Sequence, residues 1–133
     1  MIVVGHTKCG GAAACLAAAQ AHGDGGAADG EHRIPHPVPS RPITDPINGW
    51  LLPLARLAAS LALPASTGAD EALATVVREN VKAQVRNVVR APTIQKAWRH
   101  GSALEVHGWV FELESGALRD LDVSVGKETG VVV

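Results

Sequence analysis

The chain has 133 residues, 47% of them hydrophobic, and a formal net charge of −1 at pH 7. A chain of this size can bury one substantial core, so we expect a single domain spanning residues 1–133. Its near-neutral charge is scattered along the sequence, which argues against nucleic acid as a partner. No stretch has the length and apolar character of a secretory signal or a membrane span, so we expect no membrane partner.

The first predicted element is a short strand that ends in a histidine and a cysteine. Residues 2–5 are apolar without alternation, which is typical of a strand covered on both faces within a parallel sheet. The alanine-rich residues 11–22 predict a helix directly afterwards. His6 and Cys9 therefore lie at the carboxyl end of a strand, where α/β sheets place ligands. They could be two zinc ligands, but on these residues alone the favoured interpretation is a hydrogen-bonded core histidine and a small hydrophobic cysteine.

Cysteine usage bears on the cellular compartment. The chain contains two cysteines, Cys9 and Cys15, which are too few for a disulfide framework. We therefore expect a reducing compartment and a cytoplasmic location. Cys15 falls in the middle of the alanine-rich helix, where packing in the core is its favoured role.

The middle of the sequence predicts a loop followed by a capped helix. Residues 23–44 are rich in Gly, Pro, His and Ser, which is typical of a long loop or an insertion. Asp45 followed by Pro46 predicts an N-cap with proline in the first helical position. The helix should then run towards Leu61, with a kink or a restricted start at Pro53.

The second half of the sequence predicts two helices and a hairpin. Residues 70–90 carry apolar residues at helical spacings, namely Leu73, Val76, Val77, Val81, Val85, Val88 and Val89. Pro92 opens a shorter helix that Gly101 closes. Residues 104–113 predict a strand, and the alternating residues 118–125 complete a β-hairpin. The predicted fold class is α/β, the remnant of a mostly parallel β-sheet flanked by helices with a C-terminal antiparallel β-hairpin.

Several other conspicuous side chains are interpreted as structural. His107 lies within a predicted strand, and His100 lies at a helix end, where it should contact the last carbonyl groups. The three tryptophans, Trp50, Trp98 and Trp109, lack an accompanying basic stripe, so we expect them to anchor the core.

Four spaced motifs make the chain resemble the C-terminal two-thirds of a β-class carbonic anhydrase. They are Gly5-His6-Thr7-Lys8-Cys9-Gly10-Gly11, Trp50-Leu51, Asn80-Val81 with Gln84-Val85, and Val106-His107-Gly108-Trp109-Val110, in that family's order. The 23–44 loop and the C-terminal tail fall outside the pattern. The resemblance implies a zinc enzyme, a lyase that reversibly hydrates carbon dioxide to bicarbonate.

The resemblance also implies roles for individual residues. Proteins of this family bind zinc through two cysteines and a histidine, and His6 and Cys9 match two of these three ligands. Zinc with an open position acidifies a bound water to a pKa of about 7, which produces the hydroxide that attacks carbon dioxide. The amides of Gly10 and Gly11 could face bicarbonate, or the two glycines could simply form the turn at the start of a helix. No residue of this chain is assigned as a catalytic acid or base.

One segment of the family pattern is absent from the sequence. The family's other zinc cysteine lies upstream in a Cys-x-Asp-x-Arg segment, which also supplies an aspartate and arginine pair, and no such segment occurs here. The ligand set is therefore incomplete, and we expect this chain alone to bind zinc weakly. Without the family's first strands, residues 2–5 should become a sheet edge with unpaired amides.

These departures leave two explanations and two functions open. The domain could be incomplete at its N-terminus because the natural product is longer, or the short form could associate with another chain, as a homo-oligomer or with a paralogue. The first function is a carbonic anhydrase whose remaining ligand and acid–base pair come from other sequence. The second is a catalytically silent relative that acts as an interaction or regulatory subunit of a complete paralogue.

Overall fold

The structure is a computed structural model that describes residues 1–23 and 36–127. The chain divides into two compact units. The sheet unit comprises Met1–Thr7 and Val77–Val133, and the helical unit comprises Lys8–Val76. Compact units within a chain can belong to one domain, so the expected single domain stays a prediction.

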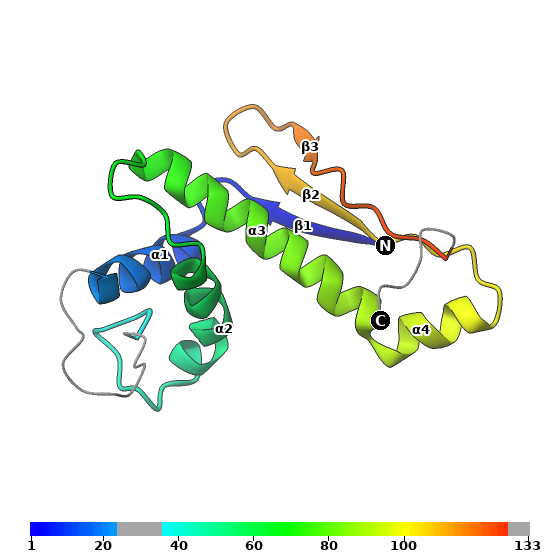
Figure 1. Cartoon of the computed structure of the whole chain (residues 1–133), viewed down its shortest axis with the longest axis horizontal. Helices are drawn as coiled ribbons and strands as arrows, with labels where there is room; N and C mark the ends of the chain where they lie inside the picture. Colours follow the sequence, from blue (N-terminus) through cyan, green and yellow to red (C-terminus); the bar gives the residue numbers. More distant parts are fainter. Residues whose placement is uncertain (24–35, 128–133) are drawn as a thin grey trace. The chain divides into compact units, whose positions relative to one another are not determined.

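The sheet unit contains three strands in the order β1-β2-β3, as Figure 1 shows. These strands are β1 (Ile2–His6), β2 (His107–Phe111) and β3 (Leu118–Asp120). β1 pairs parallel to β2 with Val4 opposite Trp109, and β2 pairs antiparallel to β3 with Trp109 opposite Asp120. The mixed sheet confirms the predicted α/β class with its parallel pairing and its C-terminal hairpin.

The second hairpin strand is shorter than the alternating residues 118–125 predicted. Asp122 has a φ of 55°, and its backbone N–H donates to the carboxylate of Asp120 over 2.9 Å. This left-handed turn stops the ladder after three residues, because an extended strand requires negative φ. Pairing returns as one isolated antiparallel bridge between Val106 and Val125.

One face of the sheet packs on helix α3 (Ala69–Arg90), which runs alongside β1 in Figure 1. Two glycines allow the close approach. A Cβ atom built at Gly5 would lie 2.6 Å from Val81 Cγ2, and one at Gly108 would lie 3.0 Å from Val85 Cγ2. One buried cluster of this unit consists of Val85, Val89, Ile94, Trp98 and Val106.

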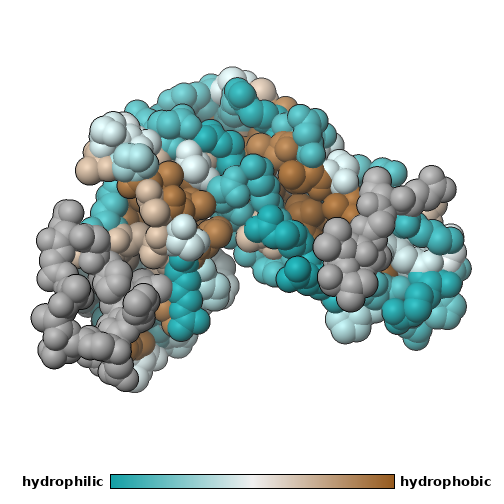
Figure 2. All heavy atoms as spheres, viewed as in Figure 1, coloured by the Kyte–Doolittle hydropathy of each residue, from teal (hydrophilic) through white to brown (hydrophobic). Residues whose placement is uncertain are grey.

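The opposite face of the sheet is only partly covered. Residues opposite one another in a sheet project to the same face, so Ile2, Val4 and His6 of β1 share this face with Leu118 of β3. The exposed fractions are 47% for Ile2, 51% for Val4 and 55% for Leu118. The expectation that residues 2–5 are covered on both faces is therefore wrong. Apolar residues are visible at the surface in the space-filling view of Figure 2.

Helix α4 (Pro92–Arg99) closes one end of the sheet unit. Trp98 is buried, and its indole Nε1–H donates to the Leu104 carbonyl over 2.7 Å, so it is a core anchor as expected. His100 caps the end of the helix, because its Nδ1 lies 2.7 Å from the Lys96 carbonyl oxygen. This contact confirms the role predicted for His100.

The helical unit contains α1 (Gly10–Gly23), α2 (Pro46–Ser60) and the start of α3. The Asp45 carboxylate accepts a hydrogen bond from the Ile47 N–H over 3.0 Å, and Pro46 opens the helix, as predicted. The helix continues through Pro53 to Ser60, and Leu61 is its C-cap. Of the predicted 23–44 loop, residues 24–35 lie outside the described residues, and 36–44 contain neither helix nor strand.

The core of the helical unit forms where α1 packs on α2. Cys15, Leu51 and Ala55 are fully or almost fully buried there. Trp50 is 76% exposed, so the expectation that it anchors the core is wrong, because the next position, Leu51, is the one that faces inward. Among the described residues, no helix has the length and apolar character needed to cross a membrane.

Candidate functional site

His6 is the last residue of β1, and its imidazole is exposed. The ring Nδ1 lies 2.9 Å from the Thr7 carbonyl oxygen. A carbonyl oxygen can only accept, so this hydrogen bond requires a proton on Nδ1. In the neutral ring the lone pair is then on Nε2, which is the state in which a histidine binds a metal.

Thr7 anchors the end of β1 to the end of β2. Its backbone N–H donates to the Phe111 carbonyl over 3.0 Å, and its Oγ1 accepts from the Leu113 N–H over 3.0 Å. These two hydrogen bonds hold the backbone next to His6 in register with the central strand. The position of this imidazole at the carboxyl end of the strand therefore follows from the sheet itself.

Cys9 belongs to the helical unit and immediately precedes α1. Its thiol is free and half-buried, and its carbonyl accepts the first helical hydrogen bond, from the Ala13 N–H over 2.9 Å. Lys8, between the two predicted ligands, has a φ of 55°. A lysine in this left-handed region marks a tight turn, which separates the extended strand from the helix.

The predicted zinc pair is chemically suitable but incomplete. An imidazole nitrogen and a thiolate are typical zinc ligands, and zinc sites draw three or four ligands from the protein. Within residues 1–23 and 36–127, no group of three or more His, Cys, Asp or Glu side chains could hold a metal ion. The described residues therefore do not fit a complete zinc site, and His6 and Cys9 remain predicted ligands.

The two glycines after Cys9 begin α1. A Cβ atom built at Gly10 would meet nothing within 4 Å, and one at Gly11 would make an ordinary contact with Leu51 Cδ2 at 3.5 Å. Packing therefore does not require glycine at either position. Binding of bicarbonate by these amides remains a prediction.

Cys15 is not suited to replace the missing ligand. It is fully buried, and its thiol donates to the Leu51 carbonyl over 3.6 Å. Burial, with a further contribution from Cys9, raises the pKa of Cys15 from 9.0 to about 11. Zinc binds the thiolate, and this environment favours the thiol. The predicted packing role of Cys15 is confirmed.

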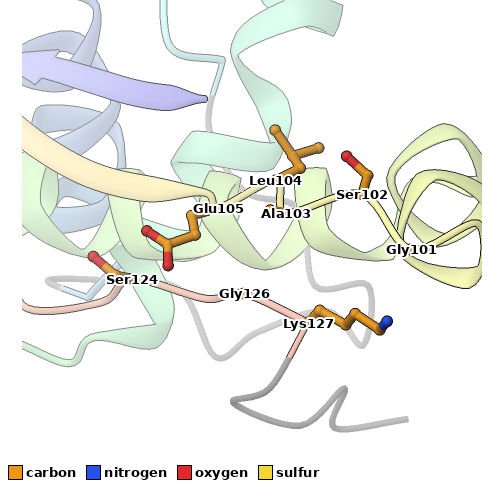
Figure 3. A pocket seen from close by; sticks show the side chains of 8 residues that line it. All are labelled: Gly101, Ser102, Ala103, Leu104, Glu105, Ser124, Gly126 and Lys127. Carbon is orange, nitrogen blue, oxygen red and sulfur yellow. The ribbon is translucent and has the colours of Figure 1, made fainter.

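A separate hollow of about 520 Å³ lies in the sheet unit, near the end of α4. Figure 3 shows its lining, which consists of Gly101, Ser102, Ala103, Leu104, Glu105, Ser124, Gly126 and Lys127. Neither His6 nor Cys9 belongs to this lining. His107 contacts two of its members, with Nδ1 2.8 Å from Ser124 Oγ and Nε2 3.5 Å from Glu105 Oε2. These contacts tie β2 to the C-terminal segment, which agrees with the structural role predicted for His107.

The fold and the site together define an α/β protein with a histidine at the carboxyl end of a strand and a cysteine at the start of the next helix. The carbonic anhydrase family model matches residues 1–118. Carbonic anhydrase 1 of Escherichia coli is 41% identical over 49 residues, which cover 37% of this chain and 22% of that protein. The chain belongs to the β-class carbonic anhydrase family.

Solved structures agree with this assignment. A Coccomyxa β-carbonic anhydrase in complex with acetazolamide has a TM-score of 0.68 and 28% identity, covering 94% of this chain and 47% of its own. The β-carbonic anhydrase CafA of Aspergillus fumigatus has a TM-score of 0.65 and 30% identity, with coverages of 96% and 50%. A structure of tetrameric β-carbonic anhydrases from Sordaria macrospora matches with a TM-score of 0.64 and 28% identity, covering 94% of this chain and 53% of its own. This chain spans about half the length of these solved relatives.

Proposed function

We propose that this chain provides the His6 and Cys9 part of a zinc site in a protein that reversibly hydrates carbon dioxide to bicarbonate. The observation that carries the proposal is the family match over residues 1–118, which includes both residues in the Gly-His-x-x-Cys-Gly-Gly segment. The hydrogen bond from His6 Nδ1 to the Thr7 carbonyl supports it, because it leaves Nε2 for a metal.

The proposal assigns a limited role to the chain itself. His6 and Cys9 bind zinc, and Gly10 and Gly11 direct backbone amides toward the bicarbonate anion. Bound zinc supplies Lewis acidity, which lowers the pKa of a coordinated water to about 7. The remaining ligand and the proton-handling groups come from residues outside the described set or from another chain, either a second copy or a paralogue. The proposed location is the cytoplasm, where both cysteines stay reduced.

Zinc content per chain, measured beside carbon dioxide hydration in the same preparation, tests the proposal. In equilibrium dialysis against added zinc, which detects weak binding, we expect the zinc bound per chain to fall to background in His6→Gln and in Cys9→Ser. The matched controls are His100→Gln, an exposed imidazole at a helix end, and Cys15→Ala, a buried thiol, and both should retain the parental content. Zinc retained in Cys9→Ser would refute the ligand assignment.

A second function is favoured by the incomplete ligand set among the described residues. We propose as the alternative a catalytically silent relative that binds a complete paralogue and regulates it. This alternative predicts no zinc and no hydration by the chain alone, together with a changed hydration rate when the chain is mixed with a complete β-class enzyme. A mixture whose rate equals the sum of the separate rates, with no co-elution, would exclude it.

A further inference from the structure

The hydrogen bonds between β1 and β2 follow the regular alternation of a parallel pair. At one end the His107 N–H donates to the Met1 carbonyl over 2.9 Å. At the other end the Thr7 N–H donates to the Phe111 carbonyl over 3.0 Å. In a parallel pair, a residue whose N–H donates to the partner strand also accepts with its carbonyl, from the partner residue two positions further along. The register therefore predicts one more bond, from the Leu113 N–H to the Thr7 carbonyl.

The side chain of Thr7 makes this last bond in place of its carbonyl. The Leu113 N–H donates to Thr7 Oγ1 over 3.0 Å. The Thr7 carbonyl instead accepts from the imidazole of His6, whose Nδ1 lies 2.9 Å away. Lys8, the next residue, has a φ of 55°, so the chain leaves the extended conformation directly after Thr7. The carbonyl is thus released from the ladder at the point where the strand ends.

We propose that the hydroxyl of Thr7 is the group that orients the His6 imidazole. By accepting the Leu113 N–H, the hydroxyl frees the Thr7 carbonyl for the Nδ1–H of His6, and the lone pair of the neutral ring then lies on Nε2. Thr7 acts through His6 and is a positioning residue. The use of Nε2 for a metal rests on the proposed function, whereas the exchange of hydrogen bonds itself needs no metal.

The exchange requires a short side chain with an oxygen acceptor. Serine carries the same hydroxyl, whereas valine keeps the β-branched shape of threonine without an acceptor. In Thr7→Val the Leu113 N–H loses its partner, which is unfavourable, so it should draw the carbonyl of residue 7 back into the ladder. A ladder bond lies in the plane of the sheet, and the His6 side chain stands out of that plane. The imidazole should therefore lose its acceptor.

Nitrogen-15 NMR of the histidine rings tests the inference in the 133-residue chain. Long-range proton–nitrogen correlations show which ring nitrogen carries the proton, and the His6 signal is identified by its loss in His6→Gln. The spectra are recorded in a metal chelator at about pH 8.5, where histidine side chains are neutral. We expect the proton on Nδ1 in the parent chain and in Thr7→Ser. In Thr7→Val the signal should shift toward the Nε2-protonated form, which neutral imidazoles favour in water.

Matched variants separate positioning from a general loss of structure. Thr75→Val makes the same substitution in α3, where the hydroxyl donates to Glu71 Oε1 over 3.3 Å, and should leave the His6 signal unchanged. Circular dichroism that matches the parent confirms that each variant is folded. Thr7→Ser loses the methyl group and keeps the hydroxyl, so its agreement with the parent would assign the effect to the hydroxyl.

Two results would overturn the inference. One is a proton on Nε2 of His6 in the parent chain, and the other is a folded Thr7→Val variant whose His6 signal matches the parent.

Zinc binding to the same variants, measured by equilibrium dialysis, distinguishes this inference from the proposed function. If the parent binds zinc, Thr7→Val should weaken the binding roughly 10–100-fold, as removal of a partner of a metal-binding histidine typically does, and Thr7→Ser should not. Unchanged affinity in Thr7→Val would also overturn the inference. Absence of zinc from the parent would count against the proposed function alone, because the position of the His6 proton is measured without metal.

Discussion

Replacing Gly108 by alanine tests whether a glycine is needed where β2 packs on α3. A Cβ atom at this position would lie 2.6 Å from Val123 Cγ2, 3.0 Å from Val85 Cγ2 and 3.2 Å from Val81 Cγ1. The valine side chains are stiff, and Val85 and Val81 are buried on the helix side. The methyl group therefore cannot be accommodated without moving a side chain or the strand.

The change in the free energy of unfolding caused by Gly108→Ala is the sum of two opposing effects. Overpacking of a well-packed core typically costs about 1–3 kcal/mol. Alanine also restricts the unfolded chain more than glycine does, which returns about 0.5–1 kcal/mol. Because the closest contact, at 2.6 Å, is shorter than any relaxed contact of a Cβ atom, the first effect should dominate. We expect Gly108→Ala to lower the free energy of unfolding by about 1–2 kcal/mol.

Urea unfolding followed by circular dichroism measures this change. Gly49→Ala in α2 is the matched control, because a Cβ atom there meets nothing within 4 Å, and it should stabilise the chain by about 0.5–1 kcal/mol. A double-mutant cycle with Val123→Ala should recover part of the cost, since it removes the closest methyl group. A Gly108→Ala variant as stable as the parent, or one with no coupling to Val123, would refute the reasoning.

Two further predictions concern the helical unit. Asn48 is buried, and its side chain accepts from the Val38 N–H over 2.9 Å and donates to the Pro42 carbonyl over 2.9 Å. Asn48→Ala should therefore lower the free energy of unfolding, measured in urea, by about 1–3 kcal/mol. It should also expose the Val38 amide to hydrogen exchange. An unchanged free energy of unfolding would show that these hydrogen bonds do not stabilise the segment of residues 36–44. Cys15 should resist iodoacetamide at pH 8 while Cys9 reacts, because burial raises the pKa of Cys15 to about 11. The thiol of Cys15 ionises at a lower pH in the unfolded chain than in the folded chain. The stabilisation that comes from keeping this thiol buried is therefore fully present below pH 9.0 and is lost as the pH rises toward 11. Urea unfolding at several pH values would detect this loss.

The elements that could be predicted from sequence are those with strong local signals. The Asp45 N-cap and Pro46 mark the start of α2, and the capping hydrogen bond to the Ile47 amide is present. The valine spacing of residues 70–90 corresponds to α3, which covers Ala69–Arg90. The family was also predictable, because four ordered motifs carry more information than composition.

Features that the hydrophobic pattern does not encode could not be predicted in the same way. The alternation of residues 118–125 is that of a strand, but the left-handed turn at Asp122, stabilised by Asp120, ends β3 early. The apolar run of residues 2–5 does not reveal which of its faces is covered; this depends on α3, which is distant in sequence. Trp50 likewise lies one position from the inward-facing Leu51, and composition alone does not determine the orientation of the helix.

The predicted zinc site and the backbone pairing of β1 meet at His6. His6 supplies a predicted metal ligand through its side chain, and its backbone N–H and C=O point away from β2, because the neighbouring Thr7 N–H is the group that donates to the Phe111 carbonyl. A strand that pairs there also places its side chains next to His6, because residues opposite one another on paired strands share a face. A ligating side chain on a strand beside β1 would therefore lie close to the predicted metal ligand of His6.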